Sequence, residues 1–113
     1  MSLEQTHREE ARQIAREVAR IARSGKVLPG SIIERHTHCG RAGCACQADP
    51  PRPHGPYWQW TRKVKAKTVS RWLDKRLGPE YAIWVQNDRQ IHQLIARLEA
   101  IGIEHLEAET RPH

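Results

Sequence analysis

The 113-residue chain has no long hydrophobic run. Its longest unbroken apolar stretch runs from Tyr81 to Val85, which is far short of the ~18 residues that a membrane span needs. An acid- and arginine-rich segment stands at the N-terminus where a secretory signal would place an apolar core. We therefore expect a cytoplasmic protein that forms one compact domain with a modest core.

Cysteine is also scarce, and its three copies lie together at Cys39, Cys44 and Cys46. Small secreted domains are held by an even number of cysteines spread along the chain, and this pattern does not match that framework. The cluster therefore favours metal binding or thiol chemistry over structural disulfides.

Acidic residues are few in the middle of the chain. Residues 26–77 carry eleven Lys or Arg against three Asp or Glu, a local charge of +8, whereas residues 1–25 carry +1 and residues 78–113 carry −3. A local excess of this size attracts polyanions. Nucleic acid is therefore the expected partner of the central region.

Residues 2–24 are predicted to form a helix. Ser2 and Gln5 match a capping box, and Gly25 fits the position after the last turn. Apolar residues recur at helical spacing at Ala11, Ile14, Val18, Ile21 and Ala22. The arginines on the other side of this helix stand three or four residues from glutamates, so ordinary intrahelical pairing is favoured over contact with phosphates.

The middle segment, residues 26–77, is predicted to be a small antiparallel sheet. Residues 31–38 read as one strand, and residues 56–64 and 67–73 read as a hairpin. The connection contains neither glycine nor asparagine, so the turn type stays open. If Val64 pairs with Lys67, one face collects the core candidates Trp58, Trp60, Val64, Val69 and Leu73.

Residues 78–113 are predicted to hold a long helix and a weakly ordered tail. Pro79 fits the first helical turn and Gly102 is expected to end the helix. An apolar stripe is formed by Trp84, Ile91, Leu94, Ile95, Leu98 and Ile101. Part of it can pack on the first helix or on a second copy of the chain, and both remain open. The fold class is α+β, with a sheet of one strand plus a hairpin flanked by two helices.

The cysteines and one histidine match the ligand set of a structural zinc ion. The predicted ligands are Cys39, Cys44, Cys46 and His54, and three cysteines with one histidine close a tetrahedral zinc site. Residues 26–77 hold only eight large aliphatic side chains, so a bound ion would supply stability that their core lacks. A disulfide, another thiophilic metal, or plain unligated thiols are alternatives, and His36 or His38 is an alternative to His54.

The same stretch resembles a family of small uncharacterised bacterial and archaeal proteins, often found among mobile-element genes. The resemblance covers about residues 30–77 and rests on a Cys-Gly-x3-Cys-x-Cys segment followed by His-Gly-Pro-Tyr and a strand pair. The matching positions are Cys39, Gly40, Cys44, Cys46, His54, Gly55, Pro56, Tyr57, Lys67 and Thr68. The resemblance implies that this arrangement is a module, and it implies no particular function.

The hairpin and the residues after it are predicted to bind nucleic acid. The basic candidates are Arg62, Lys63, Lys65, Lys67, Arg71, Lys75 and Arg76. A basic two-stranded ribbon fits a groove or a phosphate backbone, and Tyr57 or Trp72 lies near enough in sequence to stack on an unpaired base.

We therefore expect a zinc-stabilised nucleic-acid-binding accessory or regulatory protein, acting on DNA more than on RNA. The alternative is an interaction adaptor or dimerisation module that uses the apolar stripe of the last helix. We do not expect an enzyme, because four ligands close the metal site and no carboxylate of the middle region lies in a catalytic motif.

Overall fold

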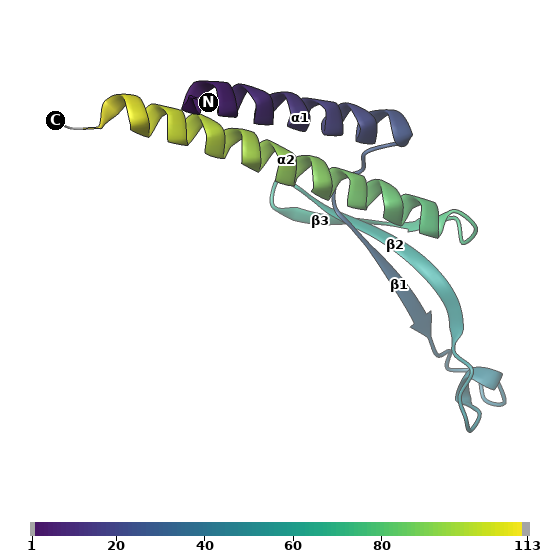
Figure 1. Ribbon diagram of the computed structural model, residues 1–113. Helices are drawn as coiled ribbons and strands as arrows, with labels where there is room; N and C mark the ends of the chain where they lie inside the picture. Colours follow the sequence, from purple (N-terminus) through teal and green to yellow (C-terminus); the bar gives the residue numbers. More distant parts are fainter. Residues whose placement is uncertain (1, 112–113) are drawn as a thin grey trace. The chain divides into compact units, whose positions relative to one another are not determined.

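The computed structural model describes residues 2–111. Its elements follow the order α1 (Leu3–Ser24), β1 (Ser31–Thr37), the short 3₁₀ helix η1 (Ala45–Gln47), β2 (His54–Val64), β3 (Lys67–Leu73) and α2 (Gly78–Thr110) (Figure 1). This arrangement confirms the predicted α+β class. No helix in the described part of the chain is long and apolar enough to cross a membrane.

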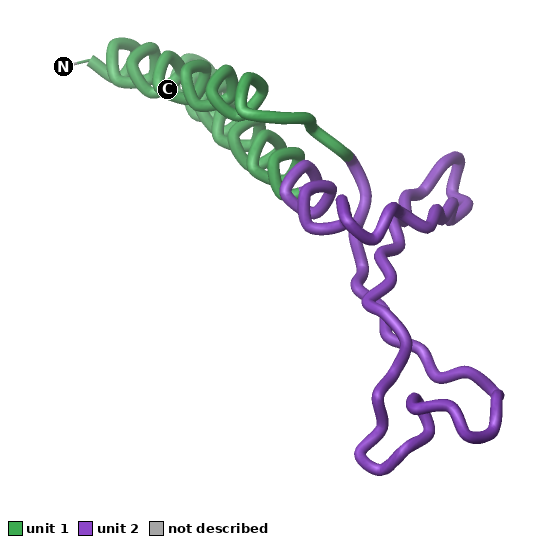
Figure 2. Tube along the Cα trace, turned by 90° about the vertical axis from the view of Figure 1, so that its right-hand side faces the viewer, with its two compact units in different colours: residues 1–28, 86–113 green, residues 29–85 purple. Residues whose placement is uncertain are grey.

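The chain divides into two compact units, coloured separately in Figure 2. The helix unit comprises residues 1–28 and 86–113, and the sheet unit comprises residues 29–85. Helix α2 contributes its first residues to the sheet unit and the rest to the helix unit. The segments expected from the sequence, 1–25, 26–77 and 78–113, were divided at the ends of helices and strands, so they differ from these two units. That they form one compact domain stays a prediction.

Helix α1 begins as predicted. The side chain of Ser2 accepts a hydrogen bond from the backbone N–H of Gln5, and the Gln5 side chain accepts one from the Ser2 backbone, which completes the capping box. The helix ends at Ser24, but Gly25 is extended at φ 176° instead of left-handed. The predicted arginine–glutamate pairs are present at Glu4–Arg8, Glu9–Arg12 and Glu17–Arg20.

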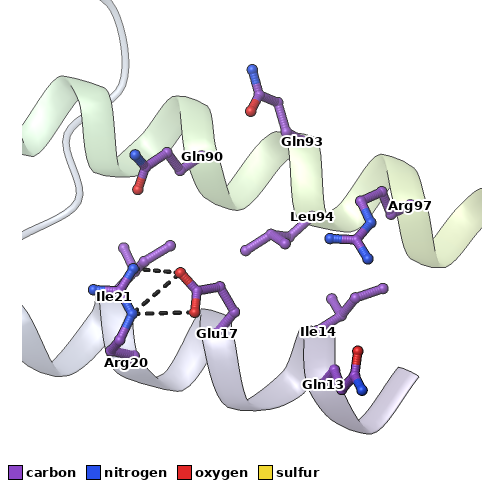
Figure 3. Close-up of a pocket in the computed structure, with 9 residues that line it drawn as sticks. All are labelled: Gln13, Ile14, Glu17, Arg20, Ile21, Gln90, Gln93, Leu94 and Arg97. Carbon is purple, nitrogen blue, oxygen red and sulfur yellow. Dashed lines mark hydrogen bonds and ion pairs between the residues drawn. The ribbon is translucent and has the colours of Figure 1, made fainter. Parts of the chain in front are cut away.

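The helix unit is closed by a seam of apolar side chains. Leu94 of α2 points toward α1 and lies with Ile14 and Ile21, which are 1% and 2% exposed (Figure 3). The two helices run antiparallel, because Nε2 of His7 near the start of α1 lies 3.1 Å from Oε2 of Glu104. Each of these three buried side chains contributes roughly 1.5 to 3 kcal/mol to the stability of the folded state. This seam is the core of the unit.

The predicted end of the last helix at Gly102 is wrong, and so is the weakly ordered tail. Helix α2 continues through Gly102 to Thr110, and residues 112–113 of the predicted tail lie outside the described residues. Glycine inside a helix costs only about 1 kcal/mol relative to alanine. Ile101 packs against the apolar seam and Glu104 contacts His7, so tertiary contacts on both sides of the glycine offset that cost.

The sheet unit holds three antiparallel strands in the order β1-β2-β3. Val64 pairs with Lys67, which confirms the predicted hairpin register. The two connecting residues, Lys65 and Ala66, have φ of 51° and 67°. Positive φ at both central residues is the geometry of a type I′ turn, which glycine or asparagine usually occupies because other residues are strained there.

The predicted core face of the hairpin is only partly buried, which corrects the expectation from its composition. Trp58 is half-buried against the start of α2, where a Cβ on Gly78 would lie 2.2 Å from Cγ of Trp58. Val64 and Val69, nearer the turn, are each 37% exposed. In the sheet unit no second layer covers that end of the ribbon, so alternation alone did not lead to burial there.

Candidate metal centre

The strands deliver His54 to the cysteine loop through an irregularity in their pairing. Arg35 pairs with Tyr57 and Thr37 pairs with His54, so two residues of β2, Gly55 and Pro56, stand opposite the single residue between the β1 partners. Such a bulge bends the strand and re-aims its side chains. A Cβ on Gly55, at φ 126°, would lie 2.7 Å from the carbonyl oxygen of Arg35, so this approach requires glycine.

The loop between the strands is folded by its own backbone. The N–H of Cys44 donates to the carbonyl of Arg41 at 3.3 Å, and the N–H of Gln47 donates to the carbonyl of Cys44 at 3.0 Å. Gly43 has φ 78°, which allows the tight turn between the first two cysteines. Helix η1 then places Cys46 at the centre of the loop, where it is fully buried.

The four predicted ligands converge. The sulfur atoms of Cys39, Cys44 and Cys46 and a ring nitrogen of His54 all lie within 4.8 Å of one another. The Sγ atoms of Cys39 and Cys46 are 3.5 Å apart, and Sγ of Cys44 is 3.2 Å from Nε2 of His54. A tetrahedral zinc ion with Zn–S bonds of about 2.3 Å separates its sulfurs by about 3.8 Å. The donor set and its spacing therefore fit one thiophilic ion.

Hydrogen bonds and burial shift the pKa values of two of these thiols in opposite directions. The backbone N–H of Arg41, together with contacts from His54 and the other two cysteines, lowers the pKa of Cys39 to about 6. Burial raises the pKa of Cys46, although the Cys39 backbone N–H donates to its sulfur at 3.3 Å. A divalent cation among these sulfurs would favour thiolates at all three positions.

Two features near the cluster bear on the ligand set. His36 lies with its Nε2 3.3 Å from Oε1 of Glu34, and the converging group contains His54 and neither His36 nor His38.

Sequence reasoning missed Gln47, whose side-chain N–H donates to the carbonyl of Cys39. No local pattern in the sequence pairs this amide with a backbone carbonyl eight residues earlier.

A family model described as a domain of unknown function, DUF6788, matches residues 6–82 of this chain, which is more than half of it. The chain belongs to the DUF6788 family. No curated protein matches the chain, and no solved structure matches it. The DUF6788 region includes residues 6–24 of α1, the whole sheet and all four residues of the cluster.

The basic residues of the DUF6788 hairpin are exposed, but they do not share one face. All seven predicted positions are exposed, namely Arg62, Lys63, Lys65, Lys67, Arg71, Lys75 and Arg76. Alternation along β2 puts Arg62 on the same face as Trp60, with its guanidinium 5.1 Å from the ring centroid, and puts Lys63 on the opposite face. Arg76 pairs with Asp74 at 3.2 Å, which offsets its charge. The positive charges thus surround the ribbon.

Proposed function

We propose that this DUF6788 protein is a zinc-stabilised nucleic-acid-binding accessory or regulatory protein of the cytoplasm, acting on DNA more than on RNA. The observation that carries the proposal is the convergence of three thiols and an imidazole at the start of β2, whose other end and turn carry exposed basic residues. Zinc would hold together the loop that connects β1 to β2. The basic side chains of the hairpin would bind phosphates. A context among bacterial or archaeal mobile-element genes belongs to the same proposal.

Metal content tests the first half of the proposal. Elemental analysis of the reduced protein should find one zinc per chain. Cys44→Ser and His54→Ala should both lose it, because each removes one of four ligands. His36→Ala is the matched control and should keep the ion, since His36 faces Glu34. A metal-free wild-type protein, or zinc retained by Cys44→Ser, would contradict the proposal.

A salt titration of DNA affinity tests the second half. Neutralising ~5 phosphates gives a slope of about −4 to −5 in a log–log plot of affinity against salt. The double variant Lys65→Gln, Lys67→Gln should reduce the magnitude of the slope by about 2. Arg8→Gln with Arg20→Gln removes the same charge from arginines that already pair with glutamates on α1, and should leave the slope unchanged. Salt-independent binding would remove the electrostatic basis of the proposal.

A second candidate function rests on apolar side chains that α2 leaves exposed. Ile95 and Leu98 are 43% and 38% exposed, and Ile103 and Leu106 are 56% and 60% exposed. In this alternative a second copy of the chain covers them and the basic ribbon only aids solubility. Leu98→Asp should then convert a dimer to a monomer in sedimentation velocity without loss of zinc. A wild-type monomer at all concentrations would exclude this alternative.

A further inference from the structure

The face of the sheet opposite Trp58 and Trp60 carries two exposed aromatic rings. Trp72 of β3 is 62% exposed and Tyr57 of β2 is 39% exposed. Their ring centroids lie 6.2 Å apart with the planes at 77°, so the edge of one ring meets the face of the other. Strand pairing sets Trp72 beside Gln59, and alternation puts Tyr57 and Gln59 on the same face. A broad part of the indole is left in solvent.

A hollow opens beside these rings. Thr37, Tyr57 and Trp72 line a space of about 350 Å³. This volume falls within the range of small-molecule pockets, about 300 to 1,000 Å³. The wall is formed by two aromatic side chains and one hydroxyl, which suits a flat ring with polar edges.

The charge of this face favours an anionic ligand. Its strand residues include Arg35 and Lys63 and no acidic residue, because Glu34 points to the other side by alternation. Nε of Arg35 donates to Oε1 of Gln59 at 2.7 Å, which holds the guanidinium over the sheet near the hollow. Cations and exposed aromatic rings on one face are the two elements of a surface that follows a single strand of nucleic acid.

The aromatic residues of the other face are engaged within the protein. Nε1 of Trp60 donates to the carbonyl of Pro29 at 2.7 Å, and Arg62 covers its ring. Trp58 packs on the backbone of Gly78. The Tyr57–Trp72 face is therefore the side of the sheet whose aromatic surface is available to a ligand.

We infer that the Tyr57–Trp72 face is a stacking site for an unpaired base of single-stranded nucleic acid. The inference rests on the proposed nucleic-acid binding and specifies which strand form this surface recognises. Bases inside a duplex are stacked on one another and cannot present a free face to Trp72, whereas a single strand can place one base in the hollow. Arg35, which pairs with Tyr57, contacts a phosphate next to the stacked base, and Lys63 contacts one farther along the strand.

Fluorescence anisotropy with the full zinc-loaded chain tests this site. The probes are a labelled oligothymidine of roughly 15 nucleotides and a duplex of the same length. Trp72→Ala should lower affinity for the oligothymidine about tenfold or more without changing the salt slope or duplex affinity. Trp72→Leu, which keeps an apolar side chain but no aromatic face, should lose as much, and Trp72→Phe should recover most of it.

Val69→Ala is the matched control. Val69 lies on the same strand, on the opposite face, and is also exposed, so this variant should bind both probes as the wild type does. Unchanged oligothymidine affinity in both Trp72→Ala and Trp72→Leu would overturn the stacking site while leaving salt-dependent nucleic-acid binding intact. An equal loss on duplex and single strand would also overturn it. Failure of the wild type to bind either probe would overturn both this inference and the proposed function.

Discussion

The helix unit and the sheet unit differ in what fills their interiors. In the helix unit, Ile14, Ile21 and Leu94 are almost fully buried between two antiparallel helices. In the sheet unit, the buried apolar side chains are Cys46, one of the four candidate ligands, and Val85 on α2. The comparison teaches that one unit has a packed apolar interior, whereas the other has strand pairing and a cluster of three thiols and an imidazole in its place.

Removal of the proposed zinc should give the largest difference between the units. A structural zinc ion contributes on the order of 10 kcal/mol of apparent binding free energy. Chelation should therefore abolish protection of amides between residues 39 and 57 in hydrogen exchange, while the amides of α1 and of residues 86–110 keep theirs. Restoring zinc should restore the pattern. Unaltered exchange in the cysteine loop after complete chelation would show that the sheet unit needs no ion.

Truncation of the helix seam should give the reverse effect. Ile14→Ala removes a side chain that is 1% exposed, and its cavity should cost about 2 to 5 kcal/mol of unfolding free energy. Zinc content should be unaffected, because all four candidate ligands lie in the sheet unit. Urea unfolding followed by circular dichroism measures the cost. Ile95→Ala, at a residue 43% exposed, is the control and should change stability by less than ~0.5 kcal/mol. Equal costs would contradict the assigned seam.

The rates at which the cysteines of the sheet unit are alkylated should differ from one another. In the reduced, metal-free chain the pKa of Cys39 is lowered to about 6, so its thiolate dominates above that pH. Its alkylation by iodoacetamide should rise about tenfold between pH 5 and 7 and then level off. Cys46 is buried and its pKa is raised, so it should react last. Mass spectrometry of the alkylated peptides measures both rates, and faster reaction of Cys46 would contradict this order.

The hairpin turn should show the smallest effect. Ala66→Gly relieves a positive φ of 67° and should stabilise the hairpin by about 1 kcal/mol. Ala100→Gly is the same chemical change inside α2 and should destabilise by a similar amount. Thermal unfolding of both variants gives the sign. A loss of stability in Ala66→Gly would mean that the turn is not strained.

Local signals in the sequence predicted most of the elements. The capping box of Ser2 and Gln5 and the Val64–Lys67 register depend on neighbouring residues, and both are confirmed. The convergence of the four candidate ligands was predictable because only a few residue types bind zinc and the three cysteines lie close together in the sequence. The passage of α2 through Gly102 was not predictable, since it involves the distant contact of Glu104 with His7. The exposure of Val69 depends on whether another element covers it, which periodicity does not report.

Because β2 bulges next to His54, the direction of the His54 imidazole depends on how many residues separate it from Tyr57. Neighbouring strand residues face opposite sides, so insertion or deletion of one residue between His54 and Tyr57 would turn the imidazole away from Cys44. Added length within residues 48–53 has no such effect, because that segment is not paired in the sheet. Related chains that keep the four candidate ligands should therefore vary in the number of residues before His54, within the loop. They should keep the same number of residues between His54 and Tyr57.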